Sequence, residues 1–376
     1  MRAEPIANPF LHQGSRVRSL NRVRIVALDG VPVEAGVLGL TGYDLLAAHS
    51  LQQAIIAAAD RLGLDPTAPD LIRRFDGCFG HPATRAHAIA IARSYGHRLG
   101  CLLLTLKRGD VANQAARPEW SEAHWKFWQA MRRVYLGGGM LAGRLGRYAV
   151  ATARALLADV GVADLAIERA PYAAYLPLVG LARSAPLGAT CSLVFDFGQT
   201  SVKRGYAHYH SCRLTKLDVW PDVPTVCTEL FRSDQPDQEI QQRWQRMADI
   251  IAASWDAVPP DQRSRTAIGI SLACYLLDGH PWPQDAGCYG ALQRLSPHLA
   301  TFMANALTQR LGRAVPVVLL HDGAAAGATY AGHARTVVIT LGTALGNGFP
   351  PPAGNLRRMA HDFAVRPAMG PQSVSR

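Results

Sequence analysis

The feature that most constrains the fold is a short apolar run that ends in an acidic residue and a glycine turn. Residues 193–203 read Leu-Val-Phe-Asp-Phe-Gly-Gln-Thr-Ser-Val-Lys. The apolar part predicts a buried strand that delivers Asp196, and Gly198 opens a turn rich in hydroxyl side chains. Such a turn can surround a phosphate with backbone N–H groups, while the carboxylate orients Mg²⁺ through its water shell. Alone, the pattern is weak evidence, because Asp-x-Gly follows strands in many unrelated folds.

Two related runs lie downstream. Residues 316–327 form an apolar strand that ends in a His-Asp pair and passes into a small-residue helix start. Residues 336–348 form a β-branched strand that enters a glycine and threonine turn at Gly342. Glycine in such a turn lets the backbone approach a phosphate closely. Three runs in this order are a stronger signal than any one of them.

In order and spacing, these runs resemble the phosphate-1, catalytic-aspartate and phosphate-2 segments of the actin-like ATPase superfamily, and most closely the ROK (repressor, open reading frame, kinase) sugar kinases. In that family a glycine-rich adenosine motif follows phosphate-2. Here the run that resembles it, Gly137–Gly139, lies upstream. The resemblance therefore implies an α/β, two-domain, ribonuclease H-like fold in circularly permuted order. The alternative is that these glycines form an ordinary strand-to-helix turn and that residues 1–185 are an unrelated domain.

The permuted order predicts two domains. The phosphate-1 and catalytic-aspartate domain spans residues 186–335. The adenosine and phosphate-2 domain combines residues 1–185 with 336–376, although segment 170–185 could pack on the first domain. Permutation is physically permissible, because domain termini often lie close together at the surface. The local patterns also predict a hairpin over 23–37.

The resemblance assigns a chemical role to each run. Asp322 would be the general base that accepts the proton of a substrate hydroxyl, and Asp196 would orient Mg²⁺ through water. The implied cofactors are ATP and Mg²⁺. The residues implied to bind the nucleotide are Asp196, Gly198, Thr200, Lys203, Gly342, Thr343, Gly346, Gly137, Gly138 and Gly139, and those implied to bind the substrate are His321 and Asp278. As alternatives, an aspartate at a strand end can simply cap a helix, and Lys203 can be a solvated residue.

The substrate side departs from the family pattern. His321 stands where ROK kinases have an asparagine that touches a sugar hydroxyl, so it either replaces that contact or is a packed histidine. Residues 273–274 are Ala-Cys where Pro-Gly is common. The chain has neither the Glu-x-Gly-His segment nor the Cys-x-Cys-Gly loop of the family. No zinc site is expected, because tetrahedral zinc needs several Cys or His ligands within reach.

Three functions remain to be compared. The first is an ATP-dependent kinase of a sugar or sugar derivative, in which Mg·ATP is held between two closing domains. The second is an actin-like nucleotide-binding protein without sugar transfer, either a slow ATPase or a regulatory partner. The missing family segments favour the second function, and Asp322 favours the first. A ROK-type transcription regulator fits poorly, because the helical pattern over 44–62 carries only Arg61 as a basic residue of the kind that reads DNA.

Length and charge limit the partners. The 376 residues suffice for two cores. The net charge of +11 attracts small phosphates, but arginines spread along the chain do not indicate a nucleic-acid partner. We expect a sugar-like substrate and leave a homodimer open. The sequence shows no leader-like or membrane-length apolar run, so we expect no membrane and a cytoplasmic location. Seven scattered cysteines without a CxxC pair favour reduced thiols.

Overall fold

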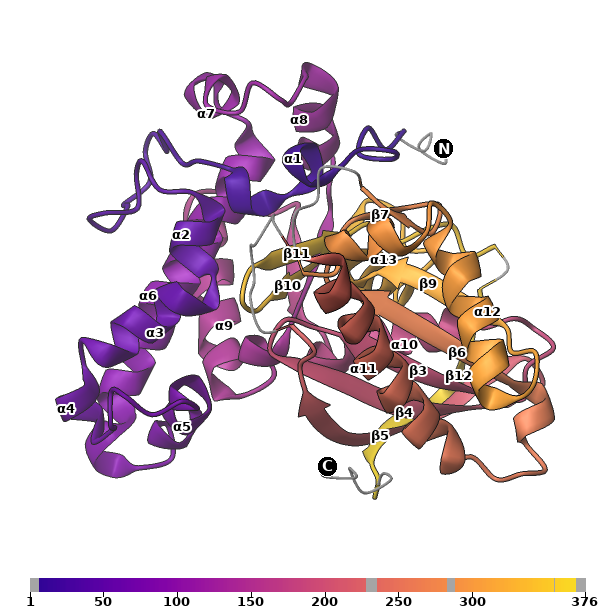
Figure 1. Cartoon of the computed structure of the whole chain (residues 1–376). Helices are drawn as coiled ribbons and strands as arrows, with labels where there is room; N and C mark the ends of the chain where they lie inside the picture. Colours follow the sequence, from indigo (N-terminus) through magenta and orange to yellow (C-terminus); the bar gives the residue numbers. More distant parts are fainter. Residues whose placement is uncertain (1–6, 228–234, 283–287, 355, 370–376) are drawn as a thin grey trace. The chain divides into compact units, whose positions relative to one another are not determined.

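The computed structural model of the chain describes residues 7–227, 235–282, 288–354 and 356–369. Contacts divide the chain into two compact units, each of which combines two segments (Figure 1). Unit 1 comprises Met1–Ala174 and Ala334–Asn347, and unit 2 comprises Tyr175–His333 and Gly348–Arg376. The chain is a mixed α/β protein whose sheets contain both parallel and antiparallel pairs.

Unit 1 is built on a sheet with the strand order β11-β10-β1-β2. The strands are β1 (Arg133–Gly137), β2 (Ala166–Arg169), β10 (Thr336–Leu341) and β11 (Leu345–Gly348). Strand β1 pairs in parallel with both β10 and β2. The side chains of Val134, Leu136, Val337 and Ile339 are buried. Such continuous apolar strands are typical of a parallel sheet covered on both faces.

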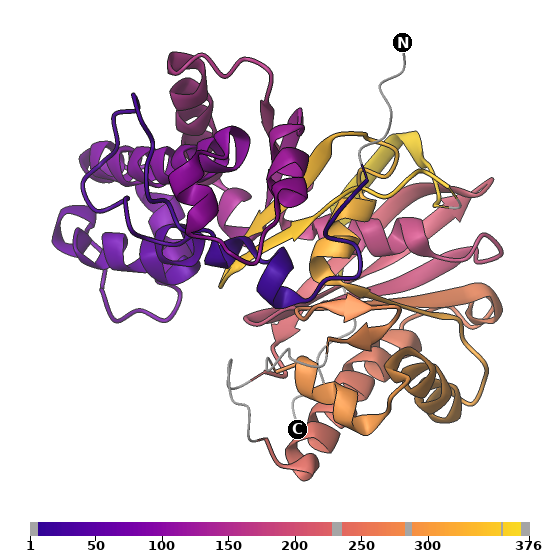
Figure 2. The ribbon, with the colours of Figure 1, turned by 90° about the horizontal axis from the view of Figure 1, so that it is seen from above.

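The helices of unit 1 come mainly from its first segment. They are α1 (Ser15–Arg18), η1 (Leu20–Arg22), α2 (Gly42–Leu46), α3 (Ala48–Ile56), α4 (Ala59–Leu62), α5 (Leu71–Cys78), α6 (Pro82–Arg108), α7 (Val111–Ala115), α8 (Glu122–Gln129), η2 (Gly139–Leu141) and α9 (Arg144–Asp159). Helix α6 lies beside α9, as Figures 1 and 2 show. A Cβ on Gly96 would overlap the backbone of Ala149, so the small residue permits the close approach of the two helices.

Unit 2 is built on a sheet with the order β12-β5-β4-β3-β6-β9. The strands are β3 (Cys191–Phe197), β4 (Ser201–His210), β5 (Arg213–Pro224), β6 (Thr266–Leu272), β9 (Val317–His321) and β12 (Met359–Pro367), and β7 (Leu276–Leu277) with β8 (His280–Pro281) forms a separate hairpin. Strands β3, β4 and β5 form an antiparallel meander. Strand β6 is parallel to β3, and β9 is parallel to β6.

Helices cover both faces of this sheet (Figure 2). They are α10 (Leu176–Ser184), α11 (Asp237–Asp256), α12 (Leu299–Leu311) and α13 (Asp322–Ala328), with the short turns η3 (Ala173–Tyr175), η4 (Arg263–Arg265) and η5 (Gly290–Leu295). Phe195 faces the core shared with α11 and α12. Val194 and Gly269 lie instead against Leu181 of α10. Because side chains alternate along a strand, Asp196 shares the α10 face with Val194.

One strand pattern occurs in both sheets. In unit 2, β3 lies between its successor β4 and the parallel strand β6, which is followed outward by β9. In unit 1, β10 lies between its successor β11 and the parallel strand β1, which is followed outward by β2. Each unit therefore places a strand–turn–strand element beside two parallel strands.

The predicted hairpin over residues 23–37 is wrong. This segment forms turns, with one isolated bridge from Arg24 to Thr41. Residues 23–25 instead form backbone hydrogen bonds with residues 39–42, among them Ile25 N to Leu40 O at 3.0 Å. The side chain of Asn113 binds the next two residues: its Oδ1 accepts from Val26 N at 2.7 Å, and its Nδ2 donates to Ala27 O at 2.8 Å.

The unit boundaries differ from the predicted domains in the tail, and they place helix α10 as the alternative for segment 170–185 allowed. The tail strand β12 belongs to unit 2, where it pairs with β5. Helix α10 also belongs to unit 2 and packs against α13. Here a Cβ on Gly180 would overlap the Ala325 carbonyl, so glycine permits the contact. Residues 370–376 of the tail lie outside the described residues. Among the described helices, none has the length and apolar character needed to cross a membrane.

The expectation of seven reduced thiols is wrong for one pair. Cys227 and Cys288 form a disulfide with their Cα atoms 5.9 Å apart. The other cysteines are free: Cys78, Cys101, Cys191 and Cys274 are buried, and Cys212 is exposed. The bonded pair is separated by 61 residues, and spacing alone cannot identify such a pairing.

Candidate functional site

Three parallel strands of unit 2 end at one edge of the sheet. In open α/β sheets, ligands bind beyond the carboxyl ends of the strands. The register places Asp196 of β3 opposite Ser271 of β6, and Leu272 of β6 opposite His321 of β9. Asp322 follows directly as the first residue of α13. The sheet therefore gathers Asp322, the predicted general base, and Asp196, the predicted Mg²⁺ residue, at this edge, which we call the aspartate edge.

Asp196 is held by its neighbours on both sides. Its side chain is 9% exposed, and its Oδ1 accepts a 2.8 Å hydrogen bond from Ser271 Oγ. Lys203 lies directly across the β3–β4 pair, and its Nζ is 3.8 Å from Asp196 Oδ2. The buried carboxylate therefore has one hydroxyl partner and one cationic partner.

The surroundings of Asp196 disfavour its negative charge. Burial raises the pKa of the Asp196 carboxyl, and the nearby charges of Asp322 and Asp222 raise it further. Lys203 and the hydrogen bond from Ser271 act in the opposite direction without cancelling the rise. A cation at this edge would stabilise the carboxylate. The donor set of hard oxygens fits hydrated Mg²⁺.

Asp322 is oriented by two donors. Its Oδ1 accepts from Gly323 N at 2.6 Å and contacts His321 Nε2 at 2.8 Å. His321 Nδ1 accepts from Ala324 N, which caps α13 and leaves the ring proton on Nε2, facing Asp322. The Tyr275 ring stacks on His321 with 4.4 Å between centroids. Among the described residues, no hydrogen bond reaches Asp322 Oδ2, so this oxygen can accept a proton.

The Gly198 turn follows Asp196 directly. Gly198 N donates to Asp196 O at 3.0 Å. The Gly198 carbonyl accepts from Thr225 Oγ1 at 2.9 Å and from Tyr289 Oη at 3.0 Å. Thr200 is exposed at the tip of the turn. The turn therefore has a fixed carbonyl and an exposed hydroxyl.

Unit 1 brings its two glycine turns together. Gly137 pairs with Thr340 in the parallel β1–β10 register, so both strands end at the same edge of the sheet. Gly138 has φ +95°, and a Cβ there would overlap the backbone of Leu341. The predicted adenosine and phosphate-2 runs, far apart in sequence, are thus neighbours in unit 1.

The two glycine turns keep open backbone surface. A Cβ on Gly139 would meet no atom within 4 Å, and one on Gly342 would meet only Ala344 O at 3.9 Å. Thr343 is half-buried within the second turn. Gly346 is required by packing, because a Cβ there would lie 2.5 Å from Thr340 Oγ1. These open glycines fit close approach of a nucleotide.

Asp278 has a structural explanation. It forms the two-residue loop between β7 and β8 together with Gly279, and both residues have positive φ, +50° and +80°. Asp-Gly is a favoured pair for such a hairpin turn. The Asp278 side chain is exposed, and the described residues show no hydrogen bond or ion pair to it. The structure does not bring Asp278 into contact with the aspartate edge.

Sequence reasoning missed several residues of the site. Ser271 could have been found, because the strand over 266–272 places a hydroxyl at its carboxyl end. Thr225 and Tyr289 could not have been found from the sequence, since they contact Gly198 from 27 and 91 residues away. Asn347 is also unexpected: its side chain is 1% exposed, and neither of its polar atoms has a hydrogen-bond partner within the described part of the chain. Buried amides are normally satisfied.

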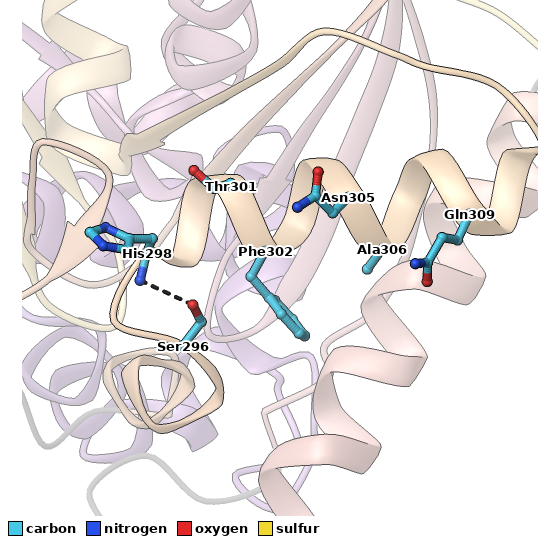
Figure 3. A pocket seen from close by; sticks show the side chains of 7 residues that line it. All are labelled: Ser296, His298, Thr301, Phe302, Asn305, Ala306 and Gln309. Carbon is cyan, nitrogen blue, oxygen red and sulfur yellow. Dashed lines mark hydrogen bonds between the residues drawn. The ribbon is translucent and has the colours of Figure 1, made fainter.

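A separate hollow of about 380 Å³ lies along α12 (Figure 3). It is lined by Ser296, His298, Thr301, Phe302, Asn305, Ala306 and Gln309. Since this lining contains no carboxylate, it offers neither a carboxylate base nor a carboxylate ligand for Mg²⁺. Within the described ranges, no group of three or more His, Cys, Asp or Glu residues could hold a metal ion directly.

Comparison with protein-family models and with curated proteins finds no match to this chain. The chemistry of the aspartate edge is therefore the basis for assigning a function. That edge combines a buried carboxylate, an oriented carboxylate and a fixed turn. These are parts that phosphoryl transfer requires, since it depends on positioning and charge stabilisation.

Proposed function

We propose that the protein is an ATP-dependent phosphotransferase that acts on a hydroxyl of a sugar or sugar derivative. The observation that carries this proposal is the aspartate edge, where the parallel strands bring buried Asp196, bonded to Ser271, and oriented Asp322, in contact with His321, to the same end of the sheet. Such differently placed acids suit separate roles, one toward Mg²⁺ and one as a base.

The strand order supports an actin-like fold in circularly permuted form. Both units repeat the arrangement of a strand–turn–strand element beside two parallel strands, as two related domains would. The glycine run at 137–139 precedes the phosphate-1 run in sequence, yet it joins the phosphate-2 run in unit 1. Fold analogy alone does not establish activity, so the argument for catalysis depends on the side chains.

The residues present fit Mg·ATP, which supplies the transferable phosphoryl group and the cation that neutralises its oxygens. Asp196 would hold the hydrated cation, with Lys203 and Thr200 toward the phosphates. The open backbone of Gly139 and Gly342 would accept close approach of the nucleotide. These roles use groups that the fold already places at two strand edges.

Asp322 would act as the general base. Its Oδ1 is occupied by Gly323 N and His321 Nε2, which fixes the plane of the carboxylate. Its Oδ2 would take the proton from the acceptor hydroxyl. A positioned base of this kind contributes roughly 10²–10⁴-fold to a rate.

A second candidate function is nucleotide binding without sugar transfer. It is favoured by His321, because both ring nitrogens are already engaged, by Ala324 N and by Asp322 Oδ1. A sugar hydroxyl could bind the ring only by displacing one of these partners. Asp278, the other substrate residue implied by the resemblance, is part of an exposed hairpin turn. The residues implied to bind the substrate thus have less structural support than the residues implied to bind the nucleotide.

The test is ADP release from Mg·ATP across a panel of hexoses and N-acetylhexosamines. Wild type is compared with Asp322→Asn and with the matched control Asp278→Asn. Sugar-dependent release that disappears only in Asp322→Asn supports the kinase. Slow sugar-independent hydrolysis, or binding without turnover, supports the second candidate. Absence of nucleotide binding contradicts both.

A further inference from the structure

The carbonyl of Gly198 is held by two hydroxyl groups from separate segments. Thr225 Oγ1 donates to it from the end of β5 at 2.9 Å. Tyr289 Oη donates to it from the start of η5 at 3.0 Å. A carbonyl oxygen has two lone pairs, and both are used here. This doubly bonded carbonyl belongs to the turn that follows Asp196.

A disulfide joins the same two segments. Cys227 lies two residues after Thr225, and its N–H donates to Thr225 Oγ1 at 3.1 Å. Cys288 immediately precedes Tyr289, and its carbonyl accepts a 2.7 Å hydrogen bond from Arg243 Nη1. The disulfide between them is buried, with Cys227 4% and Cys288 2% exposed. The cross-link therefore restrains both donors at once.

We propose that Thr225 and Tyr289 are positioning residues for the Gly198 turn, and that the Cys227–Cys288 disulfide keeps both of their hydroxyls on the Gly198 carbonyl. The redox state of the two cysteines then determines how rigidly the Gly198 turn is held. The functional consequence rests on the proposed nucleotide site. The structural consequence does not, because order of the turn can be measured without a nucleotide.

Peptide geometry links the orientation of the Gly198 carbonyl to that of the next backbone N–H group. The peptide unit is planar and trans, so fixing the Gly198 C=O also fixes the Gln199 N–H, which points the opposite way. Within the described residues, no acceptor is found for this N–H, so it is available to an anion. Backbone N–H groups of this kind form phosphate-binding turns.

Tyr289 is suited to a permanent donor role. Its side chain is fully buried, and burial raises the pKa of its phenol, so the hydroxyl stays protonated at neutral pH. Its ring contacts Phe197 edge to face, with 6.4 Å between centroids. The packing of the Tyr289 ring fixes the position of Oη, and the disulfide at Cys288 restrains the segment that carries Tyr289.

Reduction would require an external dithiol. One of its thiolates attacks a cysteine sulfur, the S–S bond breaks and a mixed disulfide forms. The second thiolate then displaces the protein sulfur, the reagent becomes a disulfide and both cysteines leave as thiols after taking up protons. Because the sulfurs are buried, the reagent reacts only when the two segments open.

The first experiment measures amide hydrogen exchange over residues 197–203 in the full chain, together with Mg·ATP titration. The variants are Tyr289→Phe, which removes one donor, and Thr225→Val, which removes the other donor together with the acceptor of Cys227 N, with Thr225→Ser as the rescue variant. We expect exchange and the Kd of Mg·ATP to rise about 3- to 10-fold for each lost hydrogen bond, and Thr225→Ser to match wild type. Thr225 is half-buried, so Thr225→Val remains informative if Tyr289→Phe fails to fold.

The second experiment compares oxidised protein, dithiothreitol-reduced protein and the Cys227→Ser/Cys288→Ser double variant, with Cys212→Ser as the control. Alkylation and mass spectrometry report the disulfide. We expect the same faster exchange in the reduced and double-variant proteins, and little added effect of Tyr289→Phe there. Unchanged exchange in these folded proteins, or alkylation of both cysteines in the untreated native protein, overturns the proposal. Faster exchange in a protein that binds no Mg·ATP upholds the positioning role and rejects the nucleotide function.

Discussion

Lys203 Nζ lies 3.8 Å from Asp196 Oδ2 because the two residues face each other across the β3–β4 pair. Strand β3 ends near Asp196, the turn at Gly198 reverses the chain, and β4 places Lys203 opposite Asp196. A single hairpin therefore builds an acid–base pair without help from distant sequence. The remaining parts of the edge depend on long-range packing.

Removing the Lys203 charge should weaken nucleotide binding. We expect Lys203→Met to raise the Kd of Mg·ATP about 10-fold, because a hydrogen bond to a charged group contributes roughly 1.5–3 kcal/mol. Lys203→Arg should restore part of the affinity. The matched control is Lys216→Met on β5, whose Nζ pairs with Asp218 at 2.7 Å. Equal losses in both Met variants would show a general charge effect instead of a site.

Asp196→Asn should stabilise the protein and abolish Mg²⁺-dependent nucleotide binding. Burial raises the pKa of Asp196, and an acid with a raised folded pKa destabilises the fold at neutral pH, where the unfolded chain is ionised. Asparagine can still accept from Ser271. Thermal unfolding without Mg²⁺ should show Tm higher by about 2–4 °C, the shift that 1 kcal/mol produces in a domain of this size. A lower Tm would mean that the pair with Lys203 outweighs the burial.

His321→Asn separates positioning from nucleotide binding. Asparagine is a good N-cap for α13, but its shorter side chain cannot reproduce the contact with Asp322. Loss of an orienting contact should lower kcat about 10- to 100-fold, by analogy with outer-shell partners of reactive groups, while the Kd of Mg·ATP stays unchanged. His321→Ala should in addition lose the cap and about 1 kcal/mol of stability. Unchanged kcat in His321→Asn would remove His321 from the mechanism.

Acidification should destabilise unit 2 through His208 and Asp218, whose Nε2 and Oδ2 are 2.8 Å apart. Burial lowers the pKa of His208 below the ordinary histidine value, so the unfolded chain takes up the proton first as pH falls. Burial raises the pKa of Asp218, but hydrogen bonds from Lys216 and His208 bring it below its usual value, so its contribution is also lost on acidification.

The pH prediction is checked by urea unfolding between pH 8 and pH 5. Stability should fall below about pH 6.5, the unperturbed pKa of histidine. His208→Gln should flatten that part of the profile relative to wild type. Parallel profiles for the two proteins would show that this pair does not carry the pH dependence.

Elements with local signals were predictable from the sequence. The sequence patterns over 192–197 and 203–209 predict two strands and that over 238–254 predicts a helix, and the structure confirms them as β3, β4 and α11. Apolar runs and helical periodicity are local signals that predict these elements without knowledge of long-range contacts. By contrast, the pattern over 290–311 predicts one long helix, but these residues form η5 and α12, because the Ser-Pro-His segment at 296–298 interrupts the helix.

Features that depend on contacts between distant residues were not predictable. The tail strand β12 finds β5 only in the folded chain, and the Cys227–Cys288 pair forms across a separation of 61 residues. In the site, Asp196 and Asp322 were identified from local motifs. The orientation of Asp322 by His321 and the hold of Tyr289 on Gly198 depend on rotamers and packing that a motif does not encode.

The most direct test of the central claim is transfer of a labelled γ-phosphoryl group from ATP to a sugar, with the product detected by mass spectrometry. Wild type, Asp322→Asn and Asp278→Asn are incubated with the same acceptor panel and Mg²⁺. The account predicts a phosphorylated sugar from wild type and Asp278→Asn, and none above background from Asp322→Asn. Equal product from all three proteins, or no product from wild type with any acceptor while ATP is bound, would contradict it.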